Sequence, residues 1–175
     1  MAINISGRQF DDNSLSETMR RVQQTTGMDL SRLELEITES ILMKNTQPMI
    51  DLLQEMSDRG VRFAIDDFGT GYSSLSYLKR FPIKLLKIDQ AFVQDITHNA
   101  DDAAIVTAII SMAHSLGLKT TAEGVETQEQ FEFLRGQGCD FAQGHYFSAS
   151  QPPDEITRLM EANLLGRVDP AITSP

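Results

Sequence analysis

Polar and charged side chains stand at the ends of six short apolar runs that are spread along the whole chain. In chain order they are Asn4 and Ser6, Glu36 and Glu39, Asp66 and Asp67, Lys87 and Asp89, Glu123 and Glu126, and Gln143. One such residue alone is most simply a solvated loop residue or a helix cap, but six run ends in succession indicate a common site. Carboxylates together with an amide oxygen are the ligands of hard cations such as Mg²⁺, Mn²⁺ or Ca²⁺.

The adjacent pair Asp66-Asp67 and the lysine Lys87 indicate which reaction such a site could perform. Consecutive residues point to opposite faces of a straight strand, but at a strand end both carboxylates can address one site or two neighbouring ions. Two metal ions about 3.5–4 Å apart form the usual clamp for in-line phosphodiester hydrolysis. Lys87 is the only cation among these run ends. It orients the attacking water, neutralises phosphoryl oxygens, or is an ordinary surface lysine.

The segment directly after the aspartate pair is rich in glycine and hydroxyl groups: Phe68, Gly69, Thr70, Gly71, Tyr72, Ser73 and Ser74. It lacks the third glycine of a dinucleotide-binding fingerprint, so a Rossmann fold is only weakly indicated. The composition fits either a mobile lid over the site or an ordinary tight turn. A nucleophilic triad is not indicated, because the chain has no Gly-X-Ser-X-Gly sequence and no paired cysteine and histidine.

Six short runs of strand-forming residues precede these polar groups, and longer helical runs separate them. The strand-forming runs are Ile3–Ile5, Leu33–Ile37, Val61–Ile65, Lys84–Ile88, Leu118–Ala122 and Cys139–Ala142. This alternation predicts an α/β fold with a parallel sheet and helices outside it. An open doubly wound sheet and a (β/α) TIM-like barrel both fit. In both, function collects at the carboxyl ends of the strands, and we favour the barrel because it brings all six ends to one mouth.

The helical runs carry start and stop signals. Two segments have the spacing of a capping box, Ser14 with Glu17 and Thr127 with Gln130. A further helix is expected to begin at Asp101 or Asp102 and to end at Gly117. Its apolar face is expected to consist of Ile105, Ile109, Met112 and Leu116. A last amphipathic helix is expected from about Pro153 to Leu165.

The composition is that of one globular domain, with 175 residues of which 41% are apolar and 23% charged. The net charge of −10 argues against DNA or RNA as a partner, since a face that binds nucleic acid needs lysine and arginine. The longest apolar stretch, Ala103–Ile110, is too short to cross a bilayer, and the first residues do not resemble a secretory signal. With Cys139 as the single cysteine, these features predict a cytoplasmic protein without a membrane segment.

Six segments of the chain together resemble the EAL-domain family of cyclic di-GMP phosphodiesterases. They are Asn4-Ile-Ser6, Leu35-Glu-Ile-Thr-Glu-Ser40, Ile65-Asp-Asp-Phe-Gly-Thr-Gly-Tyr-Ser-Ser-Leu75, Leu86-Lys-Ile-Asp89, Ala122-Glu-Gly-Val-Glu126 and Gln143-Gly-His-Tyr-Phe-Ser148. The resemblance extends to about Ala162. It implies a modified (β/α)₈ barrel that uses Mg²⁺ or Mn²⁺ to open one phosphodiester of cyclic di-GMP, giving linear pGpG.

The resemblance also implies a role for each matching residue. Asn4, Glu36 and Asp66 correspond to ligands of one metal ion, and Asp67 serves a second ion. Lys87 corresponds to the residue that positions the hydrolytic water. The two-metal site is therefore expected at the carboxyl ends of the strands.

Four more residues are assigned in the same way. Glu123 completes the catalytic set, and Glu126 and Gln143 support the metals and the ligand. Glu39 tethers the lid formed by residues 67–74. The family implies two kinds of protein partner, a second copy bound near the lid and an upstream sensory or GGDEF domain.

One feature of the family is missing from these 175 residues, the Glu-Ala-Leu signature whose glutamate is a metal ligand. In the family this signature lies on the strand before the one that carries Asn4. The nearest string, Glu161-Ala-Asn163, falls in the predicted last helix and cannot replace it. A (β/α)₈ barrel typically needs about 250 residues. We therefore expect a partial domain over residues 1–165, truncated to about six β/α units, and a tail over residues 166–175.

The missing glutamate leaves three functions in competition. The first is a phosphodiesterase that hydrolyses cyclic di-GMP weakly or not at all as this polypeptide alone, and that a segment with the signature strand would rescue. The second is a non-catalytic module that binds cyclic di-GMP or a partner. The third is a fragment without function. Retention of Asp66, Asp67, Lys87, Glu123 and Glu126 argues against the second.

Overall fold

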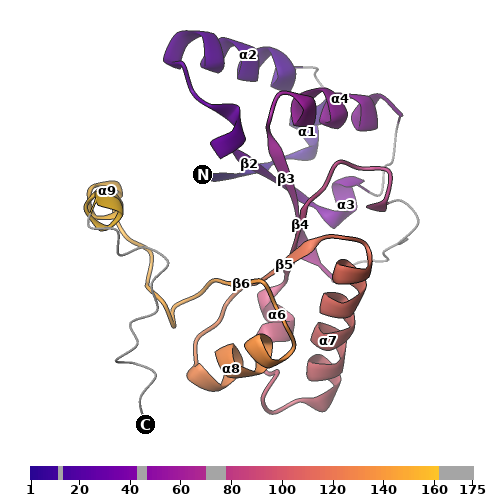
Figure 1. The fold of residues 1–175 in the computed structure, drawn as a ribbon, viewed down its shortest axis with the longest axis vertical. Helices are drawn as coiled ribbons and strands as arrows, with labels where there is room; N and C mark the ends of the chain where they lie inside the picture. The colour runs from indigo at the N-terminus through magenta and orange to yellow at the C-terminus, as the bar shows by residue number, and fades with distance from the viewer. Residues whose placement is uncertain (12–13, 43–46, 70–77, 162–175) are drawn as a thin grey trace.

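The computed structural model describes residues 1–11, 14–42, 47–69 and 78–161 (Figure 1). Six parallel strands form one sheet: β1 (Ala2–Ile5), β2 (Glu34–Thr38), β3 (Arg62–Phe68), β4 (Leu85–Ile88), β5 (Lys119–Ala122) and β6 (Phe141–Ala142). Each of the six predicted runs overlaps one of these strands, which confirms the predicted strands to within a few residues.

The strands lie side by side in the order in which they occur in the chain, from β1 to β6. A doubly wound sheet reverses its strand order at a switch point, whereas a barrel adds each new strand on the same side. The unbroken order is therefore that of a TIM-like barrel, as the sequence predicted. Within the described residues, β1 and β6 each pair with one neighbour, so these strands form an open arc of the barrel wall.

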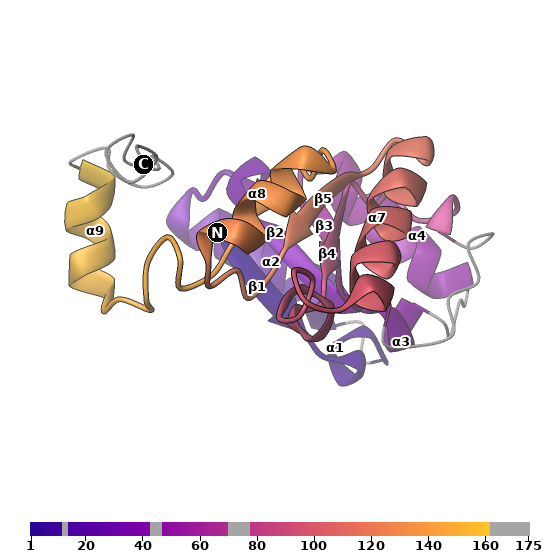
Figure 2. The ribbon, with the colours of Figure 1, turned by 90° about the horizontal axis from the view of Figure 1, so that it is seen from below.

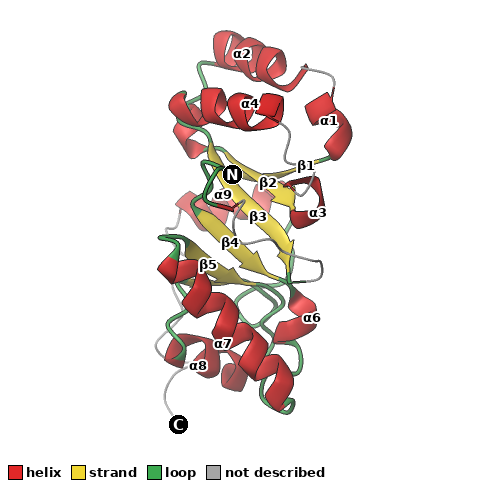
Figure 3. Ribbon diagram, turned by 90° about the vertical axis from the view of Figure 1, so that its right-hand side faces the viewer, coloured by secondary structure: helices red, strands yellow, loops and turns green. Residues whose placement is uncertain are grey.

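Helices lie along the sheet, near both its first and its last strands (Figure 3). They are α1 (Gly7–Asp11), α2 (Ser14–Thr26), α3 (Glu39–Leu42), α4 (Gln47–Asp58), α6 (Gln90–Val93), α7 (Ala100–Ser115), α8 (Gln128–Gly136) and α9 (Pro153–Glu161), with a 3₁₀ turn at Leu30–Arg32. Figure 3 shows α2 and α4 near the first strands and α7 and α8 near the last ones. Figure 2 shows α9 apart from the other helices, at the end of an extended segment. None of the described helices has the length and apolarity needed to cross a lipid bilayer.

The two faces of the sheet differ because side chains alternate along each strand. On one face, residues such as Leu35, Ile65 and Leu86 are completely buried. They share one apolar core with Leu53 of α4 and Ile110 of α7. Burying each such side chain contributes about 1.5–3 kcal/mol to stability. The helix-covered face therefore holds the domain together and leaves the other face for polar side chains.

The start and the buried face of α7 correct two predictions. The helix is capped by Asn99, whose side chain accepts a hydrogen bond from Asp101 N, and not by Asp101 or Asp102. Asparagine caps helices as well as aspartate does. The buried residues are Val106, Ile109, Ile110 and Ala113. Ile105, predicted on the apolar face, is 39% exposed because the contact face is rotated by one residue.

The other helix predictions fare differently. The capping box of Thr127 and Gln130 is confirmed at the start of α8. The helix over Ser14–Thr26 is also confirmed, and it ends directly before Gly27. The predicted helix from Pro153 is present to Glu161. Its predicted last residues and the predicted tail at 166–175 lie outside the described residues.

Candidate functional site

The sheet register brings the predicted site residues to one face. Asn4 is opposite Glu36 in the β1–β2 ladder, and Glu36 is opposite Ala64 in the β2–β3 ladder. Asp66 lies two residues beyond Ala64 and therefore points to the same side. The same counting through β4, β5 and β6 places three more predicted residues on this face, Lys87, Glu123 and Gln143.

A bulge in β3 separates the two adjacent aspartates. Ile65 pairs with Leu86 and Phe68 with Ile88, so β3 carries one extra residue at this point. Asp67 takes up the irregularity with a φ of 53°, a left-handed conformation that aspartate tolerates better than most residues. Asp66 stays buried on the polar face while Asp67 is exposed. Phe68, predicted as part of the following loop, is instead the last residue of the strand and packs into the core at 4% exposure.

The ammonium group of Lys87 lies at the centre of the polar face, between carboxylates from three other strands or strand ends. Its Nζ is 2.9 Å from Glu36 Oε2, 2.9 Å from Asp66 Oδ1 and 2.8 Å from Glu123 Oε1. The Lys87 side chain is 7% exposed, and the carboxylate side chains are between 10% and 19% exposed. We call these four residues the Lys87 cluster.

Burial and charge act against each other in the Lys87 cluster. Burial disfavours the ammonium form, but hydrogen bonds to Glu123, Glu36 and Asp66 outweigh it and raise the pKa of Lys87. Burial also raises the pKa of Glu123, with further increases from Asp66 and Glu36, against the lowering effect of Lys87. Three carboxylates share one ammonium ion, so the cluster holds more negative charge than its own cation balances.

One oxygen of the Lys87 cluster, Asp66 Oδ1, is fully buried. It lies 2.9 Å from Lys87 Nζ and has no hydrogen-bond donor besides this ammonium group. A buried, charged oxygen with one shared partner is incompletely satisfied. An added cation would satisfy it, and carboxylate oxygens are ligands that Mg²⁺ and Mn²⁺ prefer.

Asp67 belongs to a second, more exposed carboxylate group next to the Lys87 cluster. Its pKa is raised by burial, by the charge of Asp66 and by Asp89, with which it also forms a side-chain hydrogen bond. Asp89 Oδ1 in turn accepts a 2.7 Å hydrogen bond from Ala91 N and caps α6. The sequence pointed to Asp89 only as a run end, without a role.

Glu39 lies where the resemblance places the tether of the lid. It is the first residue of α3, is buried, and its Oε2 accepts a 3.3 Å hydrogen bond from Gly69 N. Gly69 has a φ of 101°, and a Cβ atom here would lie 2.9 Å from the Phe92 ring, so glycine is required. The other predicted lid residues, Thr70, Gly71, Tyr72, Ser73 and Ser74, lie outside the described residues.

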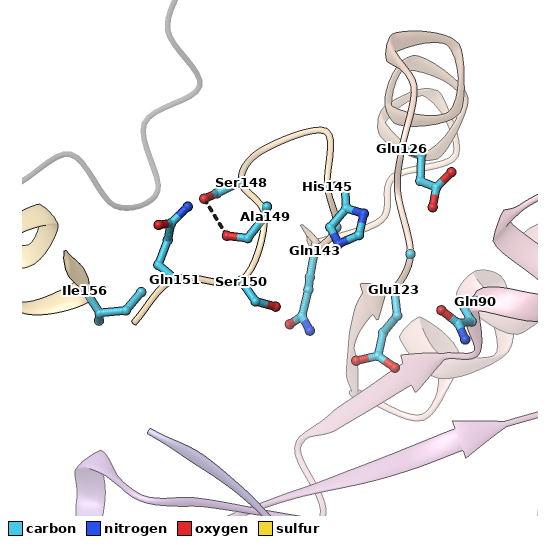
Figure 4. Close-up of a pocket in the computed structure, with 12 residues that line it drawn as sticks. Gln90, Glu123, Glu126, Gln143, His145, Ser148, Ala149, Ser150, Gln151 and Ile156 are labelled. Carbon is cyan, nitrogen blue, oxygen red and sulfur yellow. Dashed lines mark hydrogen bonds between the residues drawn. The ribbon is translucent and has the colours of Figure 1, made fainter. Parts of the chain in front are cut away.

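A pocket of about 370 Å³ extends from the Lys87 cluster towards α9. Its lining includes Gln90, Glu123, Gln143 and Ser150, which come from four different segments. Figure 4 shows Glu123 and Gln143 pointing into the same space, whereas Glu126 points away from Gln143. The pocket thus combines a partly buried carboxylate with amide and hydroxyl groups, a lining suited to a polar ligand.

Gln130 is a site-supporting residue that the sequence identified only as half of a capping box. Its Oε1 accepts hydrogen bonds from Glu126 N at 2.7 Å and Thr127 N at 3.0 Å. Its Nε2 donates to Gln94 O at 2.9 Å. The buried amide therefore fixes the loop between β5 and α8, which carries Glu123 and Glu126, to the segment after α6.

In the part of the chain that the structure describes, no group of three or more His, Cys, Asp or Glu side chains is arranged to hold a metal ion. The carboxylates of the Lys87 cluster face the lysine ammonium instead. Four other predicted metal or ligand residues are exposed: Asn4, Asp67, Glu126 and Gln143. The structure thus unites Glu36, Asp66, Lys87 and Glu123 in direct contact.

The EAL domain family matches residues 1–150. The chain belongs to this family. The match covers all six strands and the whole Lys87 cluster. The division of the chain into a domain over residues 1–165 and a tail over residues 166–175 stays a prediction.

Proteins similar to this chain include MucR of Pseudomonas aeruginosa, a bifunctional diguanylate cyclase/cyclic di-GMP phosphodiesterase. It is 43% identical over 156 residues, which are 89% of this chain and 23% of MucR. The MucR phosphodiesterase structure in complex with c-di-GMP superposes with a TM-score of 0.84, covering 89% of this chain and 63% of that one. The chain therefore spans less than a quarter of this curated relative.

Two further solved structures are similar. The EAL domain of Mycobacterium smegmatis DcpA is 38% identical, with a TM-score of 0.86 over 95% of this chain and 74% of that chain. Klebsiella pneumoniae BlrP1, in a manganese/cy-diGMP complex, is 31% identical, with a TM-score of 0.75 over 85% of this chain and 38% of that chain. These matches confirm the TIM-like α/β fold predicted from the sequence.

Proposed function

We propose that the Lys87 cluster is the centre of a phosphodiesterase site that opens one phosphodiester of cyclic di-GMP to give linear pGpG. The observation that carries this proposal is the contact of Lys87 Nζ with carboxylates from three strands at the mouth of the sheet. The MucR and BlrP1 structures, both solved with cyclic di-GMP, support the choice of substrate.

The donor set on this face fits a divalent cation. Asn4, Glu36 and Asp66 would hold one ion, and Asp67 would serve a second, with support from Glu126. The observation that favours a cation here is the buried Oδ1 of Asp66, which has no donor besides the shared Lys87 ammonium, and the BlrP1 complex contains manganese. Mg²⁺ or Mn²⁺ bound at this point would polarise the phosphoryl oxygens and offset the carboxylates' repulsion of the phosphate.

Residues of the chain itself would position the water, support the ligand and hold the lid. Lys87, held by Glu123 at 2.8 Å, positions the hydrolytic water. Glu123 belongs to both the Lys87 cluster and the pocket, so it links the reacting centre to the bound ligand. Gln143, which follows the neighbouring strand β6, supports the ligand beside Glu123 (Figure 4). Glu39, through its hydrogen bond to Gly69 N, holds the segment that leads from β3 into the proposed lid.

We also propose that this polypeptide alone hydrolyses cyclic di-GMP weakly or not at all. The 175 residues contain no Glu-Ala-Leu sequence, so one carboxylate of the family's metal site is not supplied by them. A segment that carries the signature strand would restore it. The diguanylate cyclase activity named for MucR supports a GGDEF domain as a natural partner, and a second copy of the chain near the lid is a further proposed partner.

Product analysis tests both parts of this proposal. The 175-residue chain and a fusion with the signature-bearing segment of MucR would each be incubated with cyclic di-GMP and Mg²⁺, and pGpG separated by chromatography. We expect clear turnover only by the fusion. Glu123→Gln in the fusion should reduce turnover by at least about 100-fold, whereas Glu129→Gln, an exposed carboxylate on α8, should not.

Two results would contradict the proposal. A fusion that binds cyclic di-GMP by calorimetry with Mg²⁺ but forms no pGpG is a binding module and not an enzyme. Turnover by the 175-residue chain equal to that of the fusion would contradict the impairment and leave the phosphodiesterase function in place.

A further inference from the structure

We infer that Lys87 and the divalent cation compete for Glu36 and Asp66, so that the lysine ammonium takes the cation's place in the metal-free protein. This inference rests on the metal site proposed above. It concerns what the chain does before a metal binds, and not the hydrolysis itself.

The contacts of Lys87 use the same oxygens that a cation would need. Glu36 and Asp66 present Oε2 and Oδ1 to Nζ, each at 2.9 Å. Mg²⁺ binds carboxylate oxygens at about 2.0–2.1 Å. A cation at that distance from both oxygens would lie close to the ammonium position, and two positive charges repel strongly in a buried site. The ammonium must therefore leave these two carboxylates when the cation arrives.

The burial of the Lys87 cluster explains why an internal cation is needed. Glu36 and Asp66 are each 8% exposed, and Lys87 is 5% exposed. Carboxylates at this depth, without a positive charge between them, would repel one another and lose their hydration. Lys87 keeps the carboxylates together in the absence of metal, which preserves the arrangement into which the metal binds.

The three carboxylates are not equivalent in how they hold Lys87. Glu123 makes the shortest contact, at 2.8 Å, and belongs to the pocket as well. Glu36 and Asp66, each 2.9 Å from Nζ, are the two that the proposed cation would bind. We therefore expect Lys87 to give up Asp66 and Glu36 while it stays beside Glu123.

Metal titration without cyclic di-GMP tests this competition independently of catalysis. Free Mn²⁺ would be measured by electron paramagnetic resonance for the wild-type chain, Lys87→Met and Lys84→Met. Lys84 is a matched control because it precedes β4 and is exposed. We expect Lys87→Met to bind Mn²⁺ at least about tenfold more tightly than the wild type, since the repulsion by the ammonium is removed. Lys84→Met should bind like the wild type.

The outcomes separate the competition from the proposed function. Equal or weaker Mn²⁺ binding by Lys87→Met overturns the competition, whatever the activity assay shows. Absence of Mn²⁺ binding by every variant overturns the inference together with the metal site. If Lys87→Met binds Mn²⁺ tightly but the fusion protein with Lys87 in place forms no pGpG, the proposed hydrolysis is overturned and the competition stands.

A measurement on the wild-type chain keeps the inference testable if Lys87→Met does not fold without metal. With ¹⁵N-labelled lysine, the Nζ resonance of Lys87 is followed by nuclear magnetic resonance as Mg²⁺ is added. We expect this resonance to shift with Mg²⁺ while that of Lys84 does not. Mg²⁺ binding, detected as a rise in melting temperature, with an unchanged Lys87 resonance would overturn the inference.

Discussion

Two polar networks lie at opposite ends of the strands, and they differ in how their charge is balanced. At the carboxyl ends, the Lys87 cluster has three carboxylates for one ammonium group. At the amino ends of β5 and β6, a single carboxylate has several partners. Asp140 Oδ2 accepts hydrogen bonds from Thr120 N at 2.9 Å and Thr120 Oγ1 at 3.2 Å, and lies 2.9 Å from His114 Nε2.

The pKa of a carboxyl group is shifted in opposite directions in the two networks. Burial alone would raise the pKa of Asp140, but the hydrogen bonds from His114 and Thr120 outweigh it, and that pKa is lowered. In the Lys87 cluster, burial and like charges raise the pKa of Glu123. In (β/α) barrels, the catalytic residues lie at the carboxyl ends of the strands, and residues at the amino ends contribute to stability. By this comparison, we expect Asp140 to stabilise the fold and the Lys87 cluster to bind a ligand.

The largest expected difference between the two ends is in their tolerance of a methyl group on a glycine. A Cβ atom on Gly144 would lie 2.1 Å from Val125 O, whereas one on Gly138 meets nothing closer than His114 Cε1 at 4.0 Å. We expect Gly144→Ala to lower the free energy of unfolding by more than about 3 kcal/mol, because backbone must move. Gly138→Ala, at a φ of 81°, should cost about 1 kcal/mol. Urea denaturation measures both.

The two glycine variants also differ in what they displace. Val125 N donates to Gln143 O, and Val125 O accepts from Tyr146 N, each at 3.0 Å. A shift of this segment moves a wall of the pocket, so Gly144→Ala should also weaken cyclic di-GMP binding in the fusion protein. Similar losses of stability in both variants would show that the site loop adapts as readily as the amino end.

The sequence predicted the features of this molecule that depend on neighbouring residues. Six strands follow from runs of strand-forming residues, and the capping box of Thr127 and Gln130 follows from a spacing of three. The order of the sheet follows from the alternation of strands and helices once a barrel is assumed. Local pattern was sufficient for these because each is stabilised by contacts within one element or between consecutive ones.

Features that depend on distant contacts were not predictable. The bulge that takes Phe68 into the core arises in the pairing of β3 with β4. The contacts of Lys87 with Glu36 and Glu123 require the registers of several strand pairs at once. The hydrogen bond from Gln130 to Gln94 O joins residues 36 positions apart. The sequence named the residues of the Lys87 cluster but not their mutual contacts.

Replacing one aspartate in each network by asparagine is expected to change the free energy of unfolding by smaller amounts, and in opposite directions in the two networks. Asp140→Asn weakens hydrogen bonds to a charged group and should lower the free energy of unfolding by about 1.5 kcal/mol. Asp66→Asn reduces the excess of carboxylates around Lys87 and removes the charge from a buried oxygen whose one donor, the Lys87 ammonium, is shared with two other carboxylates. We expect it to raise the free energy of unfolding by up to about 1 kcal/mol, as is common at functional sites.

This pair of variants would be measured by urea denaturation in EDTA, so that no divalent cation contributes. With excess Mn²⁺ the order should change, because binding stabilises the wild type by mass action and Asp66→Asn lacks one donor. A loss of stability in Asp66→Asn that equals the loss in Asp140→Asn would remove the distinction between the two networks.

The smallest expected effect is the dependence of the Asp140 network on pH. A carboxyl group whose pKa is lowered by folding stabilises the protein above its unfolded pKa, about 3.9 for aspartate, and loses this contribution as pH falls through the folded value. The difference in unfolding free energy between the wild type and Asp140→Asn should therefore shrink as the pH falls below about 4. Thr120→Val removes the hydroxyl donor and keeps the backbone donor. Its loss of unfolding free energy relative to the wild type should shrink over the same pH range and be smaller than that of Asp140→Asn throughout. If the difference in unfolding free energy between the wild type and Asp140→Asn stays constant down to about pH 3, the charge of Asp140 is not stabilised by its partners. The polar network at the amino end of the sheet would then not contribute to stability through this charge.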